Sequence, residues 1–255
     1  MHSIKLIVTD LDNTLLRSDK TLSDYTAGVL NRCRRANIQI AFATARPERM
    51  ARGFAVEPDY VISNNGAAVS RGGAALCTRE IPPDTAHALL GELRDCRAVT
   101  QLSAEVGHCL YINYNGPIAD KRWNPVYHDF QTPVSGRVEK ITTCCADAGV
   151  IRAILSGYPA LRCYANSDAD RQQITRRDAS KLDAVRFITG SLGLGLADVA
   201  AFGDDYNDVE LLGSCGAGVA VGNAIPEAKA AAGAVCGTND EDGPAHWIEE
   251  HLLGH

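Results

Sequence analysis

The sequence predicts an α/β protein built on a doubly wound parallel sheet, into which a smaller α+β segment is inserted. Short apolar runs at residues 4–8, 38–43 and 199–202 are dense enough to be parallel strands covered on both faces. Segments with helical periodicity lie between such runs. From residue 82 to residue 179 the simple alternation stops, and strands and helices follow one another in a mixed order. This change favours an α+β insert in an otherwise alternating fold.

The composition narrows the kinds of protein that this chain can be. It has 255 residues, 45% of them hydrophobic, and a formal net charge of -6. The length suits one large domain or two smaller ones. The mildly acidic balance argues against nucleic acid or an anionic membrane as the main partner. There is no apolar run of about 18 residues, and acidic residues follow too early for a signal peptide. We expect a soluble, mature, cytoplasmic protein of undetermined oligomeric state.

The nine cysteines are odd in number and include no CxxC pair. Disulfide scaffolds and zinc sites need paired or regular spacing. We therefore expect buried thiols in a reducing cytoplasm. A catalytic cysteine–histidine pair stays open, although nothing in the sequence selects one.

The part of the chain before the insert alternates between strands and helices. The first strand ends in residues 10–14, four of which are polar, and the second leads into Thr44, Ala45 and Arg46. Pro47 suits the first turn of another helix. The other elements predicted here are a helix at 22–36, a strand at 60–63 and a hairpin at 67–81.

The insert is expected to begin at Pro82 and Pro83, and residues 116–133 read as a long loop within it. Its predicted helices and strands are helices at 84–96 and 147–155 and strands at 98–103, 109–114, 138–145, 161–165 and 171–175. After the insert, strands at 199–202 and 218–221 alternate with helices at 181–192, 208–212, 226–232 and 244–252. Residues 1–81 and 180–255 are thus predicted to form the core, and residues 82–179 a separate domain.

Polar clusters follow three of the predicted core strands and begin one helix. The strand-end clusters are Asp10 with Asp12, Thr44, and the group Asp204, Asp205, Asn207 and Asp208, whereas Lys181 begins the helix. Parallel strands share a carboxyl edge, where open α/β sheets bind their ligands, so these clusters can converge. By itself, the first stretch has about even odds of being only a turn with capping aspartates. The other clusters decide in favour of a site.

Several carboxylates at one edge would repel one another unless a cation held them. Hard oxygen ligands favour Mg²⁺ over zinc. Lys181 and Thr44 could then supply donors to a phosphate brought to that cation. Such chemistry needs one carboxylate that attacks phosphorus and a second that moves protons. Asp10 is the better-fixed candidate for the first role and Asp12 for the second, although spacing alone does not force this assignment.

Four motifs in chain order resemble those of the haloacid dehalogenase superfamily. They are DLDNTLL at 10–16, ATARP at 43–47, the lysine of DASKLDAV at 181, and GDDYNDVEL at 203–211. The chain is similar to the Cof-type phosphatases with a type IIB cap, and SNNGA at 63–67 and GVAVGNAIPEAK at 218–229 also fit that pattern. The resemblance implies a Rossmann-like core and a cap, inserted between the second and third motifs, that closes over the site and selects the substrate.

The resemblance also implies a role for each matched residue. Asp10 would be the nucleophile and Asp12 the acid/base. The implied Mg²⁺ ligands are Asp10, the backbone carbonyl of Asp12 and Asp204, supported by Asp205 or Asp208. The implied phosphate and substrate contacts come from Thr44, Ala45, Arg46, Lys181 and Asn207. In two places the chain departs from the family pattern. Asn13 replaces a common glycine, which is mild because Asn tolerates left-handed backbone. Ala45 replaces the glycine of Thr-Gly-Arg, so the role of Arg46 is less defined.

The expected function is Mg²⁺-dependent hydrolysis of a small phosphorylated metabolite, such as a sugar phosphate, through an aspartyl phosphate. Two alternatives stay open. A phosphomannomutase-like phosphoryl transfer would use the same residues. A non-catalytic phosphometabolite-binding protein is the other alternative, but a pure binding site would not need the acid/base machinery that Asp10, Asp12, Lys181 and Asp204 provide.

Overall fold

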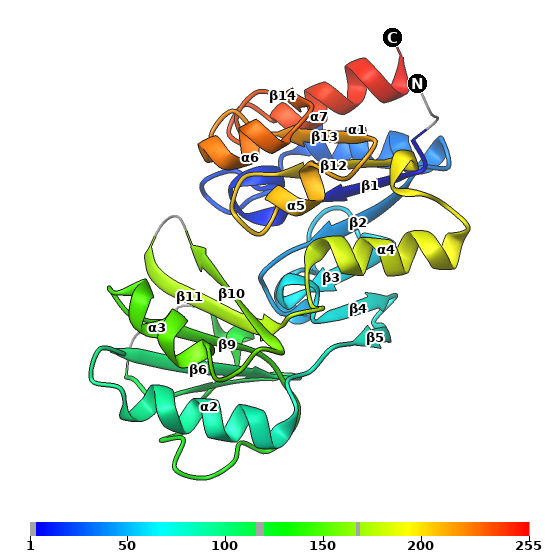
Figure 1. Cartoon of the computed structure of the whole chain (residues 1–255). Coiled ribbons are helices and arrows are strands. Elements are labelled where there is room, and N and C mark those ends of the chain that lie inside the picture. Colours follow the sequence, from blue (N-terminus) through cyan, green and yellow to red (C-terminus); the bar gives the residue numbers. More distant parts are fainter. Residues whose placement is uncertain (1–3, 116–119, 167–168, 255) are drawn as a thin grey trace. The chain divides into compact units, whose positions relative to one another are not determined.

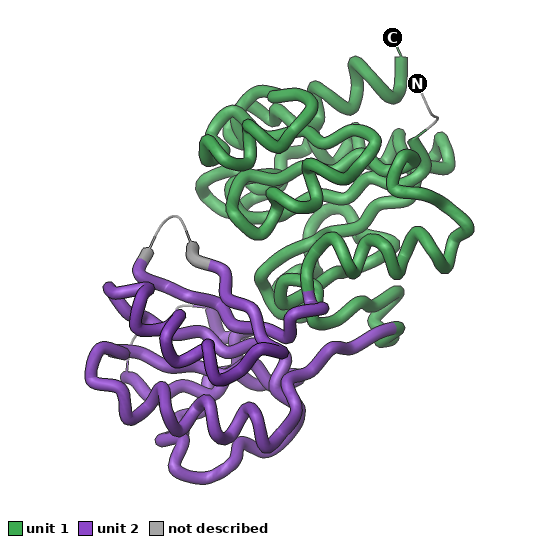
Figure 2. The backbone as a smooth tube through the Cα atoms, viewed as in Figure 1, with its two compact units in different colours: residues 1–76, 180–255 green, residues 77–179 purple. Residues whose placement is uncertain are grey.

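The computed structural model describes residues 4–115, 120–166 and 169–254, and the chain divides into two compact units. The first unit comprises residues 1–76 and 180–255, and the second comprises residues 77–179 (Figure 2). The sequence placed the start of the insert at residue 82. The residues just before it lie with the second unit because Ile81 is fully buried in that unit's hydrophobic core and pairs with Val138.

The first unit is built on an eight-stranded sheet with the order β14-β13-β12-β1-β2-β3-β4-β5 (Figure 1). Its strands are β1 (Leu6–Thr9), β2 (Gln39–Ala43), β3 (Tyr60–Ser63), β4 (Ala68–Arg71), β5 (Ala74–Thr78), β12 (Val199–Gly203), β13 (Ala217–Ala220) and β14 (Ala234–Val235). Neighbours from β14 to β3 are parallel, and β4 is antiparallel to β3. The predicted doubly wound parallel sheet is confirmed, with a hairpin at one edge.

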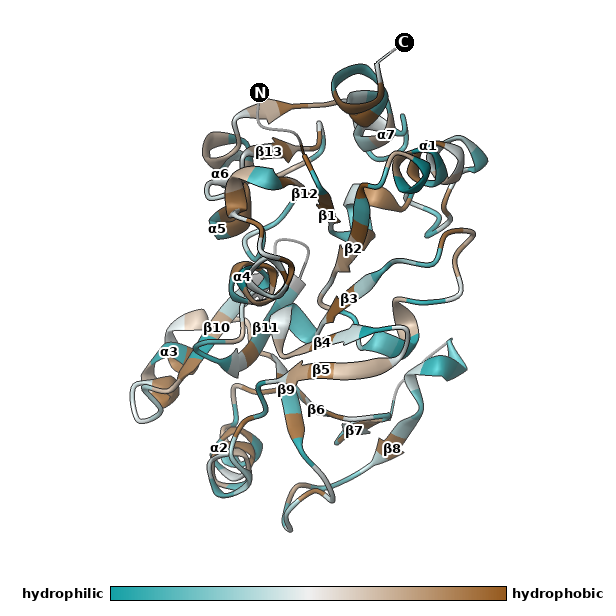
Figure 3. Ribbon diagram, turned by 90° about the vertical axis from the view of Figure 1, so that its right-hand side faces the viewer, coloured by the Kyte–Doolittle hydropathy of each residue, from teal (hydrophilic) through white to brown (hydrophobic). Residues whose placement is uncertain are grey.

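Helices cover both faces of this sheet, as a doubly wound fold requires. They are α1 (Asp24–Arg35), α4 (Lys181–Leu192), α5 (Val209–Leu212), α6 (Pro226–Ala231) and α7 (Gly243–Ile248). Figure 3 shows α1 and α7 on one side of the sheet and α4, α5 and α6 on the other. All four residues of β1 are buried between these layers. The dense apolar run in the sequence therefore has a simple cause, since the strand meets helices on both faces.

The second unit is an α+β sandwich of one sheet and two helices. Its sheet has the order β10-β11-β9-β6-β7-β8 and is antiparallel except for the β7–β8 pair. Its elements are α2 (Pro83–Asp95), β6 (Gln101–Val106), β7 (Cys109–Ile112), β8 (Pro125–Tyr127), β9 (Val138–Cys144), α3 (Ala148–Leu155), β10 (Leu161–Asn166) and β11 (Ala169–Arg176). Alternate residues of the strands, such as Leu102, Ala104 and Ile174, share a core with residues of α2 and α3.

The predictions inside the second unit were wrong in two places. The segment 116–133, expected to be a loop, contains a short 3₁₀ helix at Lys121–Trp123 and strand β8; residues 116–119 lie outside the described part. Every residue of β8 is exposed, so this strand leaves no apolar periodicity in the sequence. Strand β6 begins and ends later than predicted, because Val106 rather than Ala98 belongs to its buried face.

Two expectations from the composition concern the burial of the cysteines and the absence of a membrane-spanning helix. All nine cysteines are free thiols, but only Cys33 and Cys145 are fully buried and the other seven are partly exposed. The expectation of buried thiols therefore holds for only two of the nine. Within the described ranges, every helix is too short or too polar to cross a membrane.

Candidate active site

Three neighbouring core strands end level with one another, and each is followed by a predicted site residue. In β1, Thr9 lies opposite Phe202 of β12 and Phe42 of β2. Asp10 comes directly after β1, and its amide donates to the Phe202 carbonyl at 3.0 Å. Thr44 and Asp204 come directly after β2 and β12. The order β12-β1-β2 thus brings these clusters to one edge of the sheet.

The loop after β1 makes a sharp turn through Asn13, which has a φ of 58°. Glycine adopts this left-handed conformation easily and Asn is among the few other residues that tolerate it. The side chain of Asn223 donates to the Asn13 carbonyl at 2.7 Å and holds the turn in place. Asn13 therefore adopts the left-handed conformation that a glycine would supply at this position.

Asp10, Asp204 and Asp208 form a buried acidic cluster. Each offers one carboxylate oxygen, and these three oxygens lie within 4.8 Å of one another. Burial raises the pKa of Asp10 and Asp204 well above the ordinary carboxyl value, and the other aspartates of the cluster raise it further. Full ionisation of this cluster therefore needs a compensating cation. Hard carboxylate oxygens at this spacing suit a Mg²⁺ site.

Asp208 is held by groups of its own loop and by a lysine. One of its oxygens accepts from Lys181 Nζ at 2.7 Å, and the other accepts from the amides of Asp204 and Asp205 at 3.2 and 3.3 Å. This close fit requires Gly203, because a Cβ there would lie 2.4 Å from Asp208 Cγ. Both oxygens of Asp208 are thus engaged, which suits a supporting role better than a primary metal contact.

Lys181 connects the acidic cluster to the start of α4. Its Nζ lies 3.0 Å from Asp10 Oδ1 and 2.7 Å from Asp208 Oδ1, and its side chain is fully buried. Burial favours the neutral amine, but Asp10 and Asp208 outweigh it, so the pKa of Lys181 is raised and the group stays charged. The turn at Gly66 packs against this helix start: a Cβ on Gly66 would lie 2.1 Å from the Ser180 carbonyl oxygen.

Asp12 lies in a different electrostatic environment from Asp10. Its two oxygens accept from Arg46 Nε and Nη2, both at 2.6 Å, and Lys20 Nζ is 3.0 Å from Oδ1. Burial alone would raise the pKa of Asp12, but the hydrogen bonds and charges of Arg46 and Lys20 outweigh it and lower the pKa. Asp12 is therefore an ionised carboxylate with two cationic partners.

The remaining predicted residues are held by neighbours of the same loops. Thr44 is buried, and its hydroxyl oxygen accepts from the Arg46 amide at 3.1 Å; Ala45, between them, is partly exposed. Asn207 donates to Asn65 Oδ1 at 2.8 Å. Asp205 accepts from the Tyr206 amide at 2.8 Å and, in the described part of the chain, lies outside the acidic cluster, as Asp12 does. The parts of these residues in metal or phosphate binding stay predictions.

Three side chains that the sequence did not single out also support the site. Thr14 donates to Asp204 Oδ1 at 2.7 Å, Lys20 contacts Asp12, and Asn65 holds Asn207. Thr14 and Asn65 lie inside motifs that the sequence does display, so their positions were a usable signal. Lys20 is a half-exposed lysine in a polar loop, and no pattern in the sequence distinguishes it.

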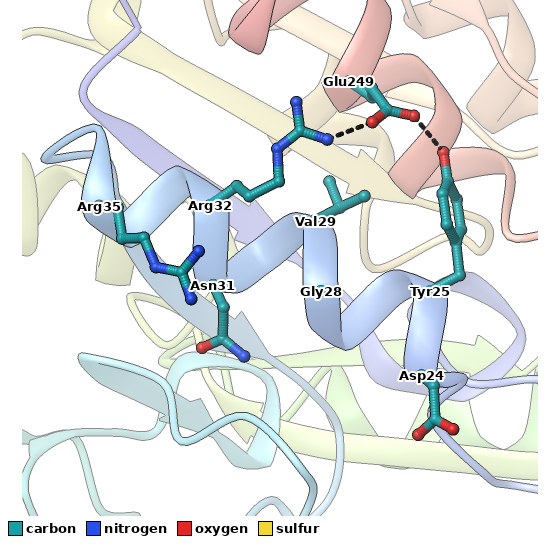
Figure 4. A pocket seen from close by; sticks show the side chains of 8 residues that line it. All are labelled: Asp24, Tyr25, Gly28, Val29, Asn31, Arg32, Arg35 and Glu249. Atoms are coloured by element: carbon teal, nitrogen blue, oxygen red, sulfur yellow. Dashed lines mark hydrogen bonds and ion pairs between the residues drawn. The ribbon is translucent and has the colours of Figure 1, made fainter.

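A shallow pocket forms elsewhere on the core unit, lined by α1 and Glu249 (Figure 4). Glu249 accepts from Tyr25 Oη at 2.6 Å and pairs with Arg32. These contacts tie α1 to the C-terminal segment. The pocket is therefore explained by packing between two helical segments and adds no chemistry to the strand-end site.

The charged Lys181 contacts two carboxylates, and Asp204 lies close enough to them to share a metal ion. Such an arrangement suits the binding and transfer of a phosphoryl group. The fold and the site together define a protein of the phosphoryl-transfer class. The chain belongs to the haloacid dehalogenase-like hydrolases, whose family model matches residues 7–248.

Relatives and solved structures agree with this family. The chain is 30% identical over 246 residues to an HMP-PP phosphatase of Escherichia coli (strain 55989 / EAEC), covering 89% of this chain and 87% of the relative. A haloacid dehalogenase-like hydrolase from B. subtilis is 26% identical, with a TM-score of 0.83 over 98% of this chain and all of that one. A subclass IIB sugar phosphatase, 21% identical, shares the fold with a TM-score of 0.83 over 96% of this chain and 98% of that one. The predicted family and the phosphatase class are confirmed.

Proposed function

We propose that the protein hydrolyses a small phosphorylated metabolite in a Mg²⁺-dependent reaction that passes through an aspartyl phosphate on Asp10. The observation that supports this most is the contact of the buried Lys181 ammonium with both Asp10 and Asp208 at the end of β1. The relatives named above are an HMP-PP phosphatase and, by fold, a sugar phosphatase. Both names point to small phosphorylated metabolites as the substrate class.

In the first half of the reaction an oxygen of Asp10 bonds to phosphorus while the bond to the leaving oxygen breaks. Asp12, which is ionised at rest and must first take up a proton from solvent, passes that proton to the leaving oxygen, and Lys181 offsets the negative charge beside Asp10. Asp10 and Asp204, with the backbone carbonyl of Asp12, would hold Mg²⁺, which when bound neutralises charge on the phosphate oxygens. In the second half water attacks phosphorus, its proton passes to Asp12, and Asp10 is regenerated.

The second unit is proposed to select the substrate. Its helices pack on one face of its sheet, and the alternating residues of the opposite face include the buried Ser103, Glu105 and Lys140. In the sheet register Glu105 lies opposite Lys140, so a polar pair occupies positions where a purely structural sheet would carry apolar side chains. Polar groups at such positions are suited to recognise a polar metabolite.

Phosphate release from a panel of sugar phosphates, nucleotides and cofactor phosphates tests the proposal. We expect turnover with Mg²⁺, loss of turnover with EDTA, and loss in Asp10→Ala. Following the fate of sugar monophosphates separates hydrolysis from transfer, because a mutase would yield an isomeric phosphate in place of free phosphate. Full activity of Asp10→Ala would contradict the assignment of the nucleophile.

A further inference from the structure

The contact between Arg46 and Asp12 uses one whole edge of the guanidinium group. Nε donates to Oδ2 and Nη2 donates to Oδ1, both at 2.6 Å. An arginine binds a carboxylate or a phosphate through the same two parallel N–H groups. Because Asp12 occupies that edge, Arg46 cannot present it to the phosphate of a substrate at the same time. This geometry differs from the phosphate contact that the family resemblance implies for Arg46.

Arg46 is itself fixed from several sides. Its amide donates to the Thr44 hydroxyl at 3.1 Å, and its carbonyl accepts from the Asn64 amide at 2.9 Å. Its Nη1 reaches the Met50 carbonyl at 3.4 Å, and only 13% of its side chain is exposed. An arginine held in this way loses little further conformational freedom when it orients a partner. The fixed member of the pair is therefore Arg46, and the oriented member is Asp12.

The pair leaves Asp12 able to accept one more hydrogen bond. A carboxylate accepts about four hydrogen bonds over its two oxygens. Among the contacts between described residues, Oδ1 receives Arg46 Nη2 and Lys20 Nζ, whereas Oδ2 receives only Arg46 Nε. Oδ2 can therefore accept a hydrogen bond from a water molecule. Because the Arg46 guanidinium group fixes the plane of the carboxylate, it also fixes the direction from which that water can donate.

We propose that Arg46 is a positioning residue that aims the Asp12 carboxylate at the water which hydrolyses the aspartyl phosphate. The inference rests on the proposed function, because it needs Asp10 as the phosphorylated group. In this step the water oxygen bonds to phosphorus and the bond from phosphorus to the Asp10 oxygen breaks. The electron pair of that bond returns to the Asp10 carboxylate, and one water proton passes to Asp12 Oδ2.

The test separates the two halves of the reaction with p-nitrophenyl phosphate. Its leaving group departs without needing a proton, so kcat/KM reports formation of the phosphoenzyme, whereas kcat reports hydrolysis when that step is slow. For Arg46→Ala we expect kcat to fall by about 10- to 100-fold, within the range of general acid–base catalysis, and kcat/KM to change less than about threefold. Acid-quenched phosphoenzyme should accumulate. Arg46→Lys, which keeps the charge but loses the fork, should show the same split more weakly.

Two comparisons decide between positioning and other roles. In the Asp12→Asn background, Arg46→Ala should slow hydrolysis no further, because residues that act as a unit are not additive. Arg17→Ala is the matched control: Arg17 also pairs with an aspartate, Asp242, at 2.6 Å, but does not contact Asp12. We expect its phosphoenzyme fraction to equal that of the unaltered protein.

Equal losses in kcat and kcat/KM, without phosphoenzyme, would assign Arg46 to phosphate binding and overturn the inference. Accumulation in Arg17→Ala to the same extent, or additive effects with Asp12→Asn, would overturn it as well. Failure of the proposed function has a separate signature, namely turnover that survives Asp10→Ala or an unaltered protein that never forms a phosphoenzyme.

Discussion

The two units of this protein place their buried polar groups in different ways. In the core unit, Asp10, Lys181, Asp204 and Asp208 gather at the ends of strands and the start of a helix. In the inserted unit, Ser103, Glu105 and Lys140 lie within strands β6 and β9. Strand ends hold a few groups in fixed mutual geometry, which suits chemistry. A sheet face offers many replaceable positions, which suits selection among substrates.

If this contrast is correct, substitutions at the strand ends lower turnover of every substrate. The largest effect is expected for Asp10→Ala, which removes the attacking oxygen. We expect kcat to fall by about 10⁴-fold or more, in line with other losses of a catalytic nucleophile. A phosphate-release assay on several substrates checks this, with Asp19→Ala, a variant in an exposed loop, as control. A loss confined to some of the substrates would break the contrast.

The next largest effect is expected for Lys181→Met. The substitution leaves the buried Asp10 and Asp208 without their cation, and removing one member of a buried ion pair destabilises proteins by about 3–5 kcal/mol. We expect the free energy of unfolding, measured by denaturant titration without Mg²⁺, to fall by roughly that amount. Addition of Mg²⁺ should recover part of the loss. Unchanged stability would mean that the pair contributes nothing to the folded state.

Substitutions in the inserted unit should change which substrate is preferred. For Glu105→Gln and Lys140→Met we expect kcat/KM to shift by about 10-fold between substrates of the panel, which corresponds to the loss of one hydrogen bond worth about 1 kcal/mol. Hydrolysis of p-nitrophenyl phosphate, a small substrate with few polar groups, should change by less than about threefold. A uniform loss on all substrates would show that this face takes part in the chemistry.

The smallest effect concerns the dependence of stability on pH without divalent cations. The pKa values of Asp10 and Asp204 are raised in the folded state, so the folded protein binds more protons than the unfolded chain. The stabilisation from these groups is complete below their ordinary pKa of 3.8 and is lost as pH rises through the raised values. Asp204→Asn should flatten this slope in an unfolding titration with EDTA. An equal slope in both proteins would contradict the raised pKa assigned to Asp204.

The difference between strand-end groups in the core unit and groups within strands in the inserted unit also explains what could be predicted from the sequence. The core was predictable because the dense apolar run of β1 reports burial on both faces, and because Asp10, Thr44 and Asp204 directly follow strands that share an edge. In the inserted unit, β8 has no buried residue to reveal it. The positions proposed for substrate selection also lie inside strands, where an alternating pattern indicates only which face of the sheet a residue belongs to.

Within the site, the sequence indicated which residues come together but not which ones pair. The pairing of Arg46 with Asp12 depends on where two loops from different strands meet, and Lys20 joins them from a third position. The environments of Asp10 and Asp12 differ for the same reason. Two aspartates separated by one residue look equivalent in the sequence, yet one has a buried lysine and the other an arginine fork.

The most direct test of the account is to locate the phosphoryl group during turnover. Asp12→Asn should form the phosphoenzyme and hydrolyse it slowly, so acid quenching with Mg²⁺ and p-nitrophenyl phosphate should trap it. Peptide mass spectrometry should then find one phosphoryl group on the peptide that contains Asp10, and fragmentation should place it on that residue. A phosphoryl group on another residue, or turnover with no phosphorylated peptide, would contradict the central claim that Asp10 is the nucleophile.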